Sequence, residues 1–523
     1  MSTVDDNFKT FLTNISKKAN MDDLVARAKK TSLNKTLGAV ELIVLGISAI
    51  IGCGIFVMIG SAVCGTYDHV GAGPSIIISI FLAALACICP ALCYAEFASM
   101  IPVAGSAYTY TYATMGEFAG WFMGWVLVFA YAIGNITTAV SWTEYLLQFL
   151  RGFEAYLPHW VCYPPIWLVN DVRSALKICA KDGLNPDVVL PTFHGLHFSI
   201  NLPALFIVAF LGYILYKGMK ESAKMATLMV IIKLAVIILF IAVGMFYVKP
   251  ENWTPFAPNG FEGVFMGAFI IFFAYIGFDA ISTTAEETKN PQRDLPIGII
   301  GTLVACTILY VIVALVLTGM VPYQNIDFQA PLAHAMRLVG KDWIAFIISI
   351  GALAGLTSVL LIYQLGTTRI LFTMSRDKFL PRSLQKLHDK FQTPHVLTWV
   401  TAAVVIIGAL FMDIEISADL CNYGTFTSFI IVCIGVLILR KKEPNRPRPF
   451  KVPLVPLTPI IGIICCLGLM LCKLKTLSSS AIMFPIWLLI GAAIYFAYGY
   501  RQNRLEELRL IARKRREEKQ VLK

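Results

Sequence analysis

The feature that most constrains this chain is a series of long apolar runs separated by short polar segments. A helix that crosses the hydrocarbon core of a bilayer, about 30 Å thick, needs about 20 predominantly apolar residues. Twelve runs come close to this length, so the sequence predicts an all-α membrane protein with twelve transmembrane helices. The predicted spans lie near residues 41–62, 75–99, 119–149, 202–219, 225–248, 262–284, 296–320, 343–373, 396–413, 417–439, 456–473 and 481–500.

The charged residues support this prediction by their scarcity and by their distribution. They make up 14% of the 523 residues, against roughly a quarter in a soluble protein. If the N-terminus is cytoplasmic, 32 of the 43 lysines and arginines lie on the cytoplasmic side, 9 lie on the outer side, and Lys233 and Arg369 lie within spans. Because positive charge collects on the cytoplasmic side, we expect both termini in the cytoplasm. The absence of long luminal domains favours the plasma membrane. The net charge of +11 then reflects topology and attraction to anionic lipid, not nucleic acid.

The first and the sixth span contain glycines in a way that predicts interrupted helices. The first holds Gly52 and Gly54, and the sixth holds Gly277, followed two residues later by Asp279. A glycine costs about 1 kcal/mol in a helix interior, and an aspartate is suited to cap the N-terminus of a second half-helix. Glycines also allow close packing of membrane helices, but packing alone does not explain the position of Asp279. We therefore expect breaks near Gly52–Gly54 and Tyr275–Gly277.

Two such breaks offer a binding site for a zwitterion. Backbone amides at the N-terminus of a half-helix attract an anion, and the helix dipole adds to the attraction. Free carbonyls at the end of a half-helix accept hydrogen bonds from a cation, and an α-amino acid carries both charges. Paired interruptions in corresponding positions of two halves of a chain are typical of secondary transporters. The sequence therefore predicts a transporter whose substrate is an L-amino acid.

Four stretches of the chain carry a family resemblance. They read IIGCGIFV at 50–57, YAEFASMIPVAGSAYTYTYATMGE at 94–117, FFAYIGFDAISTTAEETKNPQRDLPIGI at 272–299, and GALAGLTSVLL at 351–361 followed by RILFTMSRDKFLP at 369–381. Together they resemble the amino acid–polyamine–organocation superfamily, and within it the cationic amino acid transporter family and its bacterial relatives. They cover the first eight spans in order, whereas the last four match mainly in layout. The resemblance is specific for the family and poor for the substrate.

The resemblance implies a fold of two inverted five-helix repeats, spans one to five and six to ten, followed by two extra helices, with transport by alternating access. On this basis residues 37–439 form the transport core and residues 440–500 the two additional helices. Residues 1–36 form a cytoplasmic N-terminal segment and residues 501–523 a basic cytoplasmic tail. Neither end holds enough apolar residues to fold alone.

By the same resemblance, backbone groups at the two breaks would hold the substrate. Its carboxylate would bind amides of the first break, and its amino group would bind carbonyls of both breaks. The amides are those of Cys53, Gly54 and Ile55, and the carbonyls are those of Ile50, Phe273, Ala274 and Ile276. Phe278, just beyond the second break, looks like an aromatic gate over the bound substrate. Its alternative is ordinary packing against lipid or the protein interior.

Lys233 stands alone in an apolar run, nine residues beyond Lys224 at the cytoplasmic edge. At 1.5 Å per residue this places it about 14 Å deep, near the middle of the bilayer. Ionisable residues at this depth are candidates for function, and a buried lysine that gives up its proton suits proton coupling. In proton-coupled members of the family a lysine on the fifth helix replaces a sodium ion, which would place Lys233 beside Ile50, Thr357 and Ser358. The alternative is a structural lysine that donates to carbonyls of an unwound helix and never titrates.

The third span departs from the pattern of cationic members, which resembles Gly-Trp-x-Leu-x-x-Glu-Tyr. Residues 124–131 read GWVLVFAY, so Ala130 stands where the glutamate would be. A carboxylate is the natural partner of an arginine or lysine side chain. Its absence favours neutral or broad specificity over strict transport of cationic amino acids.

We therefore expect a secondary active transporter, with proton-coupled symport as the favoured mode. An amino acid exchanger is the stronger alternative, and a sensor that binds amino acids without moving them is a weaker one. None of the seven histidines lies in the middle of a span, which argues against an enzyme, and no cofactor or metal is expected. Cys162 and Cys179 share the long outer loop, and the sequence leaves open whether they form a disulfide.

Three carboxylates lie near the cytoplasmic ends of their spans, namely Glu96, Glu286 and Glu287. The loops on that side are rich in lysine and arginine. We interpret these acids mainly as gate or interface partners of the basic inner loops.

Overall fold

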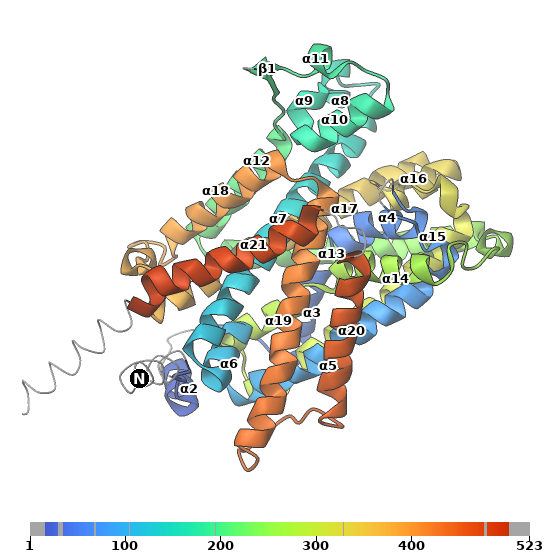
Figure 1. Ribbon diagram of the computed structural model, residues 1–523. Helices are drawn as coiled ribbons and strands as arrows, with labels where there is room; N and C mark the ends of the chain where they lie inside the picture. Colours follow the sequence, from blue (N-terminus) through green and yellow to red (C-terminus); the bar gives the residue numbers. More distant parts are fainter. Residues whose placement is uncertain are drawn as a thin grey trace, which may run out of the picture.

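The computed structural model describes residues 16–29, 35–66, 69–103, 105–193, 195–327, 329–474 and 479–501. Over these residues the chain is almost entirely helical, as predicted, and its strands are the two-residue β1 (Thr192–Phe193) and β2 (Leu196–His197). Most of the predicted N-terminal segment and nearly all of the predicted basic tail lie outside the described residues. The longer helices are α3 (Ala39–Ile50), α5 (Ile76–Met100), α7 (Glu117–Arg151), α12 (Leu202–Lys217), α13 (Met219–Gly244), α14 (Gly260–Ile271), α15 (Pro291–Met320), α17 (Asp342–Arg376), α18 (His395–Phe411), α19 (Ile414–Lys442), α20 (Leu457–Leu474) and α21 (Ser479–Ile494) (Figure 1).

The described helices support a membrane-spanning bundle. Eight segments are long and apolar enough to cross a membrane, and the pair Ala39–Ile50 and Gly54–Cys64, bent by 46°, makes a ninth if it is one span. Three shorter apolar helices, α12, α18 and α20, coincide with the three remaining predicted spans. The protein is an integral membrane protein, and the count of twelve spans stays a prediction.

The interior of the bundle is built on α7, α17 and the segment Gly260–Glu287. The most apolar stretches of α7 and of Gly260–Glu287 are 89% and 94% buried inside the protein, against 22% for Ser479–Gly499. Helix α7 packs along α17 and α19, and the rings of Tyr131 and Tyr363 stack between α7 and α17. The segment with the second predicted break is therefore central, whereas α21 turns most of its apolar surface outward.

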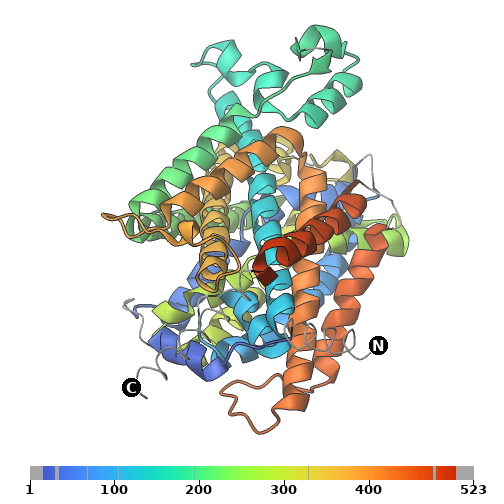
Figure 2. The same ribbon diagram turned by 60° about the vertical axis from the view of Figure 1, so that its left-hand side comes forward.

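One end of the bundle carries a lobe formed by residues 152–201 (Figures 1 and 2). It contains the short helices α8 (His159–Cys162), α9 (Ile166–Val169), α10 (Val172–Lys181) and α11 (Pro186–Val189) together with the β1–β2 hairpin. Lys177 ties the lobe to the start of α19 through ion pairs with Asp413 at 3.1 Å and Glu415 at 3.3 Å. Cys162 and Cys179 lie in the lobe as buried free thiols, so the disulfide left open by the sequence is not formed.

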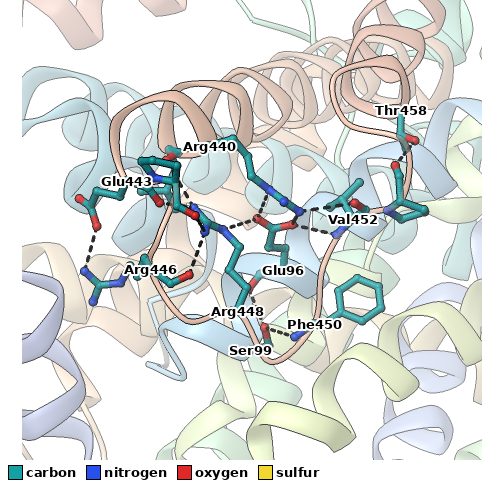
Figure 3. Close-up of polar contacts among 12 residues, drawn as sticks. Glu96, Ser99, Arg440, Glu443, Arg446, Arg448, Phe450, Val452 and Thr458 are labelled. Atoms are coloured by element: carbon teal, nitrogen blue, oxygen red, sulfur yellow. Dashed lines mark hydrogen bonds and ion pairs between the residues drawn. The ribbon is translucent and has the colours of Figure 1, made fainter.

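The opposite end of the bundle is held by a buried ion cluster (Figure 3). Glu96, near the end of α5, is 1% exposed and accepts hydrogen bonds from Arg440 at 3.0 and 2.7 Å. Arg448 pairs with the same carboxylate at 3.2 Å, and the amide of Val452 donates to it at 2.8 Å. These contacts join α5 to the end of α19 and to the loop before α20. The interpretation of Glu96 as a partner of a basic loop is confirmed.

A second junction at this end joins the chain before α3 to the helical segment Phe278–Glu287. The amides of Thr36 and Leu37 donate to the carbonyl of Glu287 at 3.0 and 3.1 Å, and the amide of Lys289 donates to Leu37 at 2.8 Å. The Glu287 carboxylate pairs with Arg369 of α17 at 2.9 Å. Glu287 thus lies at an interface, but the prediction of a partner in a basic inner loop is wrong for it, because Arg369 lies inside a predicted span.

Candidate functional site

The first predicted break is present, at the predicted glycines. Helix α3 ends at Ile50, and Ile51 has an extended backbone while its amide still donates to Ile47. The next helical hydrogen bond runs from the amide of Phe56 to the carbonyl of Gly52 at 3.1 Å. A wide helical turn over Gly54–Met58 then leads into α4 (Ile59–Cys64). The amides predicted to bind a carboxylate therefore lie where the helix restarts.

The second break is also present. Helix α14 passes into a tight 3₁₀ turn over Phe272–Tyr275, and a 3₁₀ helix over Phe278–Glu287 follows the break. Between them Ile276 is extended and Gly277 has φ +120°. This conformation is open to glycine and strained for other residues, and a Cβ atom on Gly277 would lie 3.0 Å from the carbonyl oxygen of Ala49. Glycine is required here by both conformation and space.

The two breaks touch each other in the centre of the bundle. A Cβ atom added to Gly54 would lie 2.2 Å from the Cα of Ala274, so no side chain fits between the two segments. The seven predicted substrate-binding residues are all buried. The structure thus brings the predicted amide groups and the predicted carbonyl groups into one buried region.

Two tyrosines that sequence reasoning missed donate to the predicted carbonyls. The Tyr310 hydroxyl donates to Ala274 at 2.8 Å and to Ile50 at 3.3 Å. The Tyr363 hydroxyl donates to Ile276 at 3.2 Å. Each carbonyl oxygen has a second lone pair, so these bonds orient the oxygens and leave capacity for a ligand. A single tyrosine in an apolar span carries no sequence signal for this role.

Lys233 lies in α13, fully buried, with its ammonium group against the first break. Its Nζ atom donates to the carbonyls of Ser48 at 2.9 Å and Ile51 at 2.6 Å, and to the Ser358 hydroxyl at 2.9 Å. Ser358 therefore lies at the lysine, on α17. The neighbouring Thr357 hydroxyl accepts instead from the Trp142 indole at 3.0 Å.

Asp279, expected as a helix cap, has a different partner. Its Oδ2 atom accepts from the Tyr131 hydroxyl at 2.5 Å, and its Oδ1 atom is buried with no hydrogen-bond partner. The Tyr131 ring stacks on Tyr363 with centroids 5.7 Å apart. Through these contacts α7 and α17 hold the segments on both sides of the second break.

Two further predicted positions, Ala130 and Phe278, lie around this region. Ala130 is buried against α19, where its carbonyl accepts from the Cys421 thiol at 3.2 Å. Phe278 is fully buried against Tyr94 and Phe429, with centroids 5.8 and 5.1 Å away. Packing in the protein interior is thus what the structure shows for Phe278, and a gate role stays a prediction. The Cys53 thiol lies 3.1 Å from the Ser141 hydroxyl.

Comparison with known proteins identifies the family. The family model described as amino acid permease matches residues 37–496. The chain belongs to the amino acid permease family, as the resemblance to the amino acid–polyamine–organocation superfamily predicted. This permease is 43% identical to the branched-chain amino acid permease BcaP of Bacillus subtilis, over 94% of its own length and 98% of the relative.

Other relatives carry different substrates in their names. The permease is 39% identical to the methylthioribose transporter of Bacillus subtilis, over 95% of this chain and 100% of the relative. It is 35% identical to cationic amino acid transporter 9, chloroplastic, of Arabidopsis thaliana, over 79% of this chain and 68% of the relative. These relatives are transporters and not enzymes, in agreement with the prediction from the sequence.

Proposed function

We propose that this permease is a proton-coupled symporter of neutral amino acids in the plasma membrane, working by alternating access. The observation that carries the proposal is the buried Lys233 ammonium, which donates to Ser48, Ile51 and Ser358 at the edge of the broken first span. In this proposal the chain crosses the membrane twelve times as two inverted repeats and two extra helices. The lobe lies outside, and both termini lie in the cytoplasm at the opposite end, which we call the inner end.

The broken helices supply recognition of the amino acid head group. The substrate carboxylate binds the amides of Cys53, Gly54 and Ile55, where the dipole of the restarted helix favours negative charge. The ammonium group binds the carbonyls of Ile50, Phe273, Ala274 and Ile276, three of which are oriented by Tyr310 and Tyr363. Backbone groups recognise only the head common to all amino acids. The side chain is therefore read by the surrounding helices.

Lys233 couples this site to the proton. A protonated lysine has three donors and meets three acceptors in the structure. After loss of the proton only two donors remain. Lys233 on α13 then loses one of its hydrogen bonds, either to the first break or to α17. An unpaired buried polar group is unfavourable, and the two protonation states therefore favour different positions of the broken helix. Protonation can in this way favour one orientation of the site over the other.

The substrate range follows from Ala130 and from the relatives. The site lacks the acid that pairs with a cationic side chain at this position, and a 43% identical relative is named for branched-chain amino acids. We therefore propose leucine, isoleucine and valine as substrates within a neutral range. The 39% identical relative named for methylthioribose makes that sugar a second candidate.

A proteoliposome uptake panel tests the proposal. It compares the common amino acids and methylthioribose, with and without an inward proton gradient. Gradient-dependent accumulation of a neutral amino acid supports symport. Counterflow without a gradient, together with failure to accumulate into empty liposomes, identifies an exchanger, and binding without accumulation identifies a sensor.

A further inference from the structure

A cavity of about 560 Å³ lies at the inner end, outside the central site. Its wall is formed by α2 (Met21–Lys29), by Lys35 just before α3, and by the end of α5. The end of the segment Phe278–Glu287 and the start of α15 complete the wall. Residues that line it include Val25, Lys35, Met100, Pro102, Glu286 and Arg293. Pockets for small ligands measure about 300–1,000 Å³, so the cavity has the size of a ligand site.

The wall formed by α2 contacts the rest of the protein at the start of the helix. Met21 at the start of this helix is 4% exposed. Asp22 pairs with Arg446 at 2.9 Å, and Arg446 also pairs with Glu443 at 3.0 Å. These contacts place the start of α2 against the loop after α19, with an ion pair whose Asp22 side chain is 83% exposed.

The cavity adjoins the junction that closes the inner end. Lys35 directly precedes Thr36 and Leu37, whose amides donate to Glu287, and Glu286 directly precedes Glu287. Arg293 follows on the helix that begins after this junction. A ligand in the cavity would contact segments on both sides of the junction. These segments must separate if the inner end opens toward the cytoplasm.

The chemistry of the wall fits an aliphatic zwitterion. Lys35 and Arg293 supply two cations for a carboxylate. Glu286, which also interacts with another group of the protein, supplies an acid for an ammonium group. Val25, Met100 and Pro102 supply an apolar surface. A charged pair beside an apolar surface matches an amino acid with a hydrocarbon side chain.

We propose that this cavity is a second, regulatory binding site for the transported class of amino acid, occupied from the cytoplasm. The inference rests on the proposed transport function and adds a site to it. Because the cavity is lined by residues from both sides of the junction at Glu287, we expect a ligand bound there to favour the closed inner end. Accumulated amino acid thereby slows its own further uptake.

Equilibrium binding of radiolabelled leucine to the purified full-length protein tests the site directly. The wild-type protein binds two leucines per chain, whereas Arg293→Gln and Lys35→Gln each bind one at the same leucine concentration. Arg293→Lys keeps the cation and retains the second leucine. The matched control is Lys289→Gln, an exposed lysine in the same connection that does not line the cavity, and it binds two. The proposal is overturned if the wild-type protein binds one leucine per chain, or if Lys289→Gln also loses the second leucine.

Uptake into proteoliposomes preloaded with leucine tests the regulation. Internal leucine lowers the initial uptake rate of the wild-type protein. In Arg293→Gln the internal concentration for half-inhibition rises at least fivefold, while the KM for external leucine stays the same. If the internal leucine concentration for half-inhibition is the same in Arg293→Gln as in the wild-type protein, the regulatory role is contradicted. Absence of any wild-type uptake contradicts the transport function instead, and the binding experiment still decides whether the cavity holds leucine.

Discussion

The Nζ atom of Lys233 lies 2.6 Å from the carbonyl oxygen of Ile51, the residue at which the first broken span leaves helical geometry. The same ammonium group also reaches Ser48 and, on α17, Ser358. A single buried cation thus joins three helices at the point where one of them is interrupted. This relationship connects the protonation of one side chain to the position of the substrate-binding backbone.

The contact between the two breaks predicts that Gly54→Ala abolishes transport. The added methyl group would lie 2.2 Å from the Cα of Ala274, and overpacking of this kind costs about 1–3 kcal/mol. The breaks would be forced apart, so the amides and carbonyls would no longer face one substrate. Leucine uptake into proteoliposomes measures this, with Gly468→Ala as the control because its Cβ position has no neighbour within 4 Å. Normal uptake by Gly54→Ala contradicts the close contact.

Removal of the Tyr310 hydroxyl is expected to lower the apparent affinity for leucine. Tyr310→Phe removes the donor that orients the carbonyls of Ala274 and Ile50. A hydrogen bond contributes about 0.5–1.5 kcal/mol, so we expect the KM for leucine to rise roughly two- to tenfold. Tyr156→Phe is the control, because Tyr156 is 86% exposed in the lobe. A KM equal to the wild-type value would show that these carbonyls do not need the tyrosine.

The buried ion cluster at Glu96 lies away from the substrate-binding residues. Breaking it should strongly destabilise the fold without changing those residues directly. Glu96→Gln leaves the arginines Arg440 and Arg448 without their buried anion, and breaking a buried pair costs about 3–5 kcal/mol. We expect a clear fall in the Tm of the detergent-solubilised protein. Glu443→Gln removes a more exposed partner of Arg446 and should change stability by less than about 1 kcal/mol. Equal Tm values for the two variants would contradict the assignment.

The main-chain features of the site could be predicted from the sequence because they depend on local properties. Gly52, Gly54 and Gly277 weaken a helix wherever it lies, and the breaks occur at these glycines. The helical rise predicts Lys233 near the middle of the bilayer, where a charged group must face the protein interior, and the side chain is buried there. The apolar runs likewise predict the helices, since their length is set by the bilayer.

Side-chain partners could not be predicted, because they depend on how distant helices meet. Tyr310 and Tyr363 reach carbonyls of the breaks only in the folded bundle. Asp279 has the right position for a helix cap, yet its Oδ2 atom accepts from Tyr131, 148 residues away in sequence. Glu287 pairs with Arg369 for the same reason, across 82 residues. No spacing rule within one helix contains this information.

The alanine on the third span predicts a change of substrate range. Ala130→Glu restores the acid found in cationic members, and a buried carboxylate pairs with an arginine or lysine side chain. We expect the variant to gain arginine uptake while leucine uptake falls. Ala130→Gln, of similar size and without charge, should lose leucine uptake and gain no arginine uptake. Uptake of labelled arginine and of labelled leucine, each measured on its own, checks both expectations, and no gain of arginine uptake in Ala130→Glu would contradict the assignment.

The most direct test of the account is leucine accumulation in proteoliposomes under an imposed inward proton gradient, measured for the wild-type protein and for Lys233→Ala. The account predicts that the wild-type protein concentrates leucine above the external level and that the variant does not, although it still binds leucine. Concentration of leucine by Lys233→Ala that continues to follow the proton gradient would contradict the assignment of Lys233 as the coupling residue.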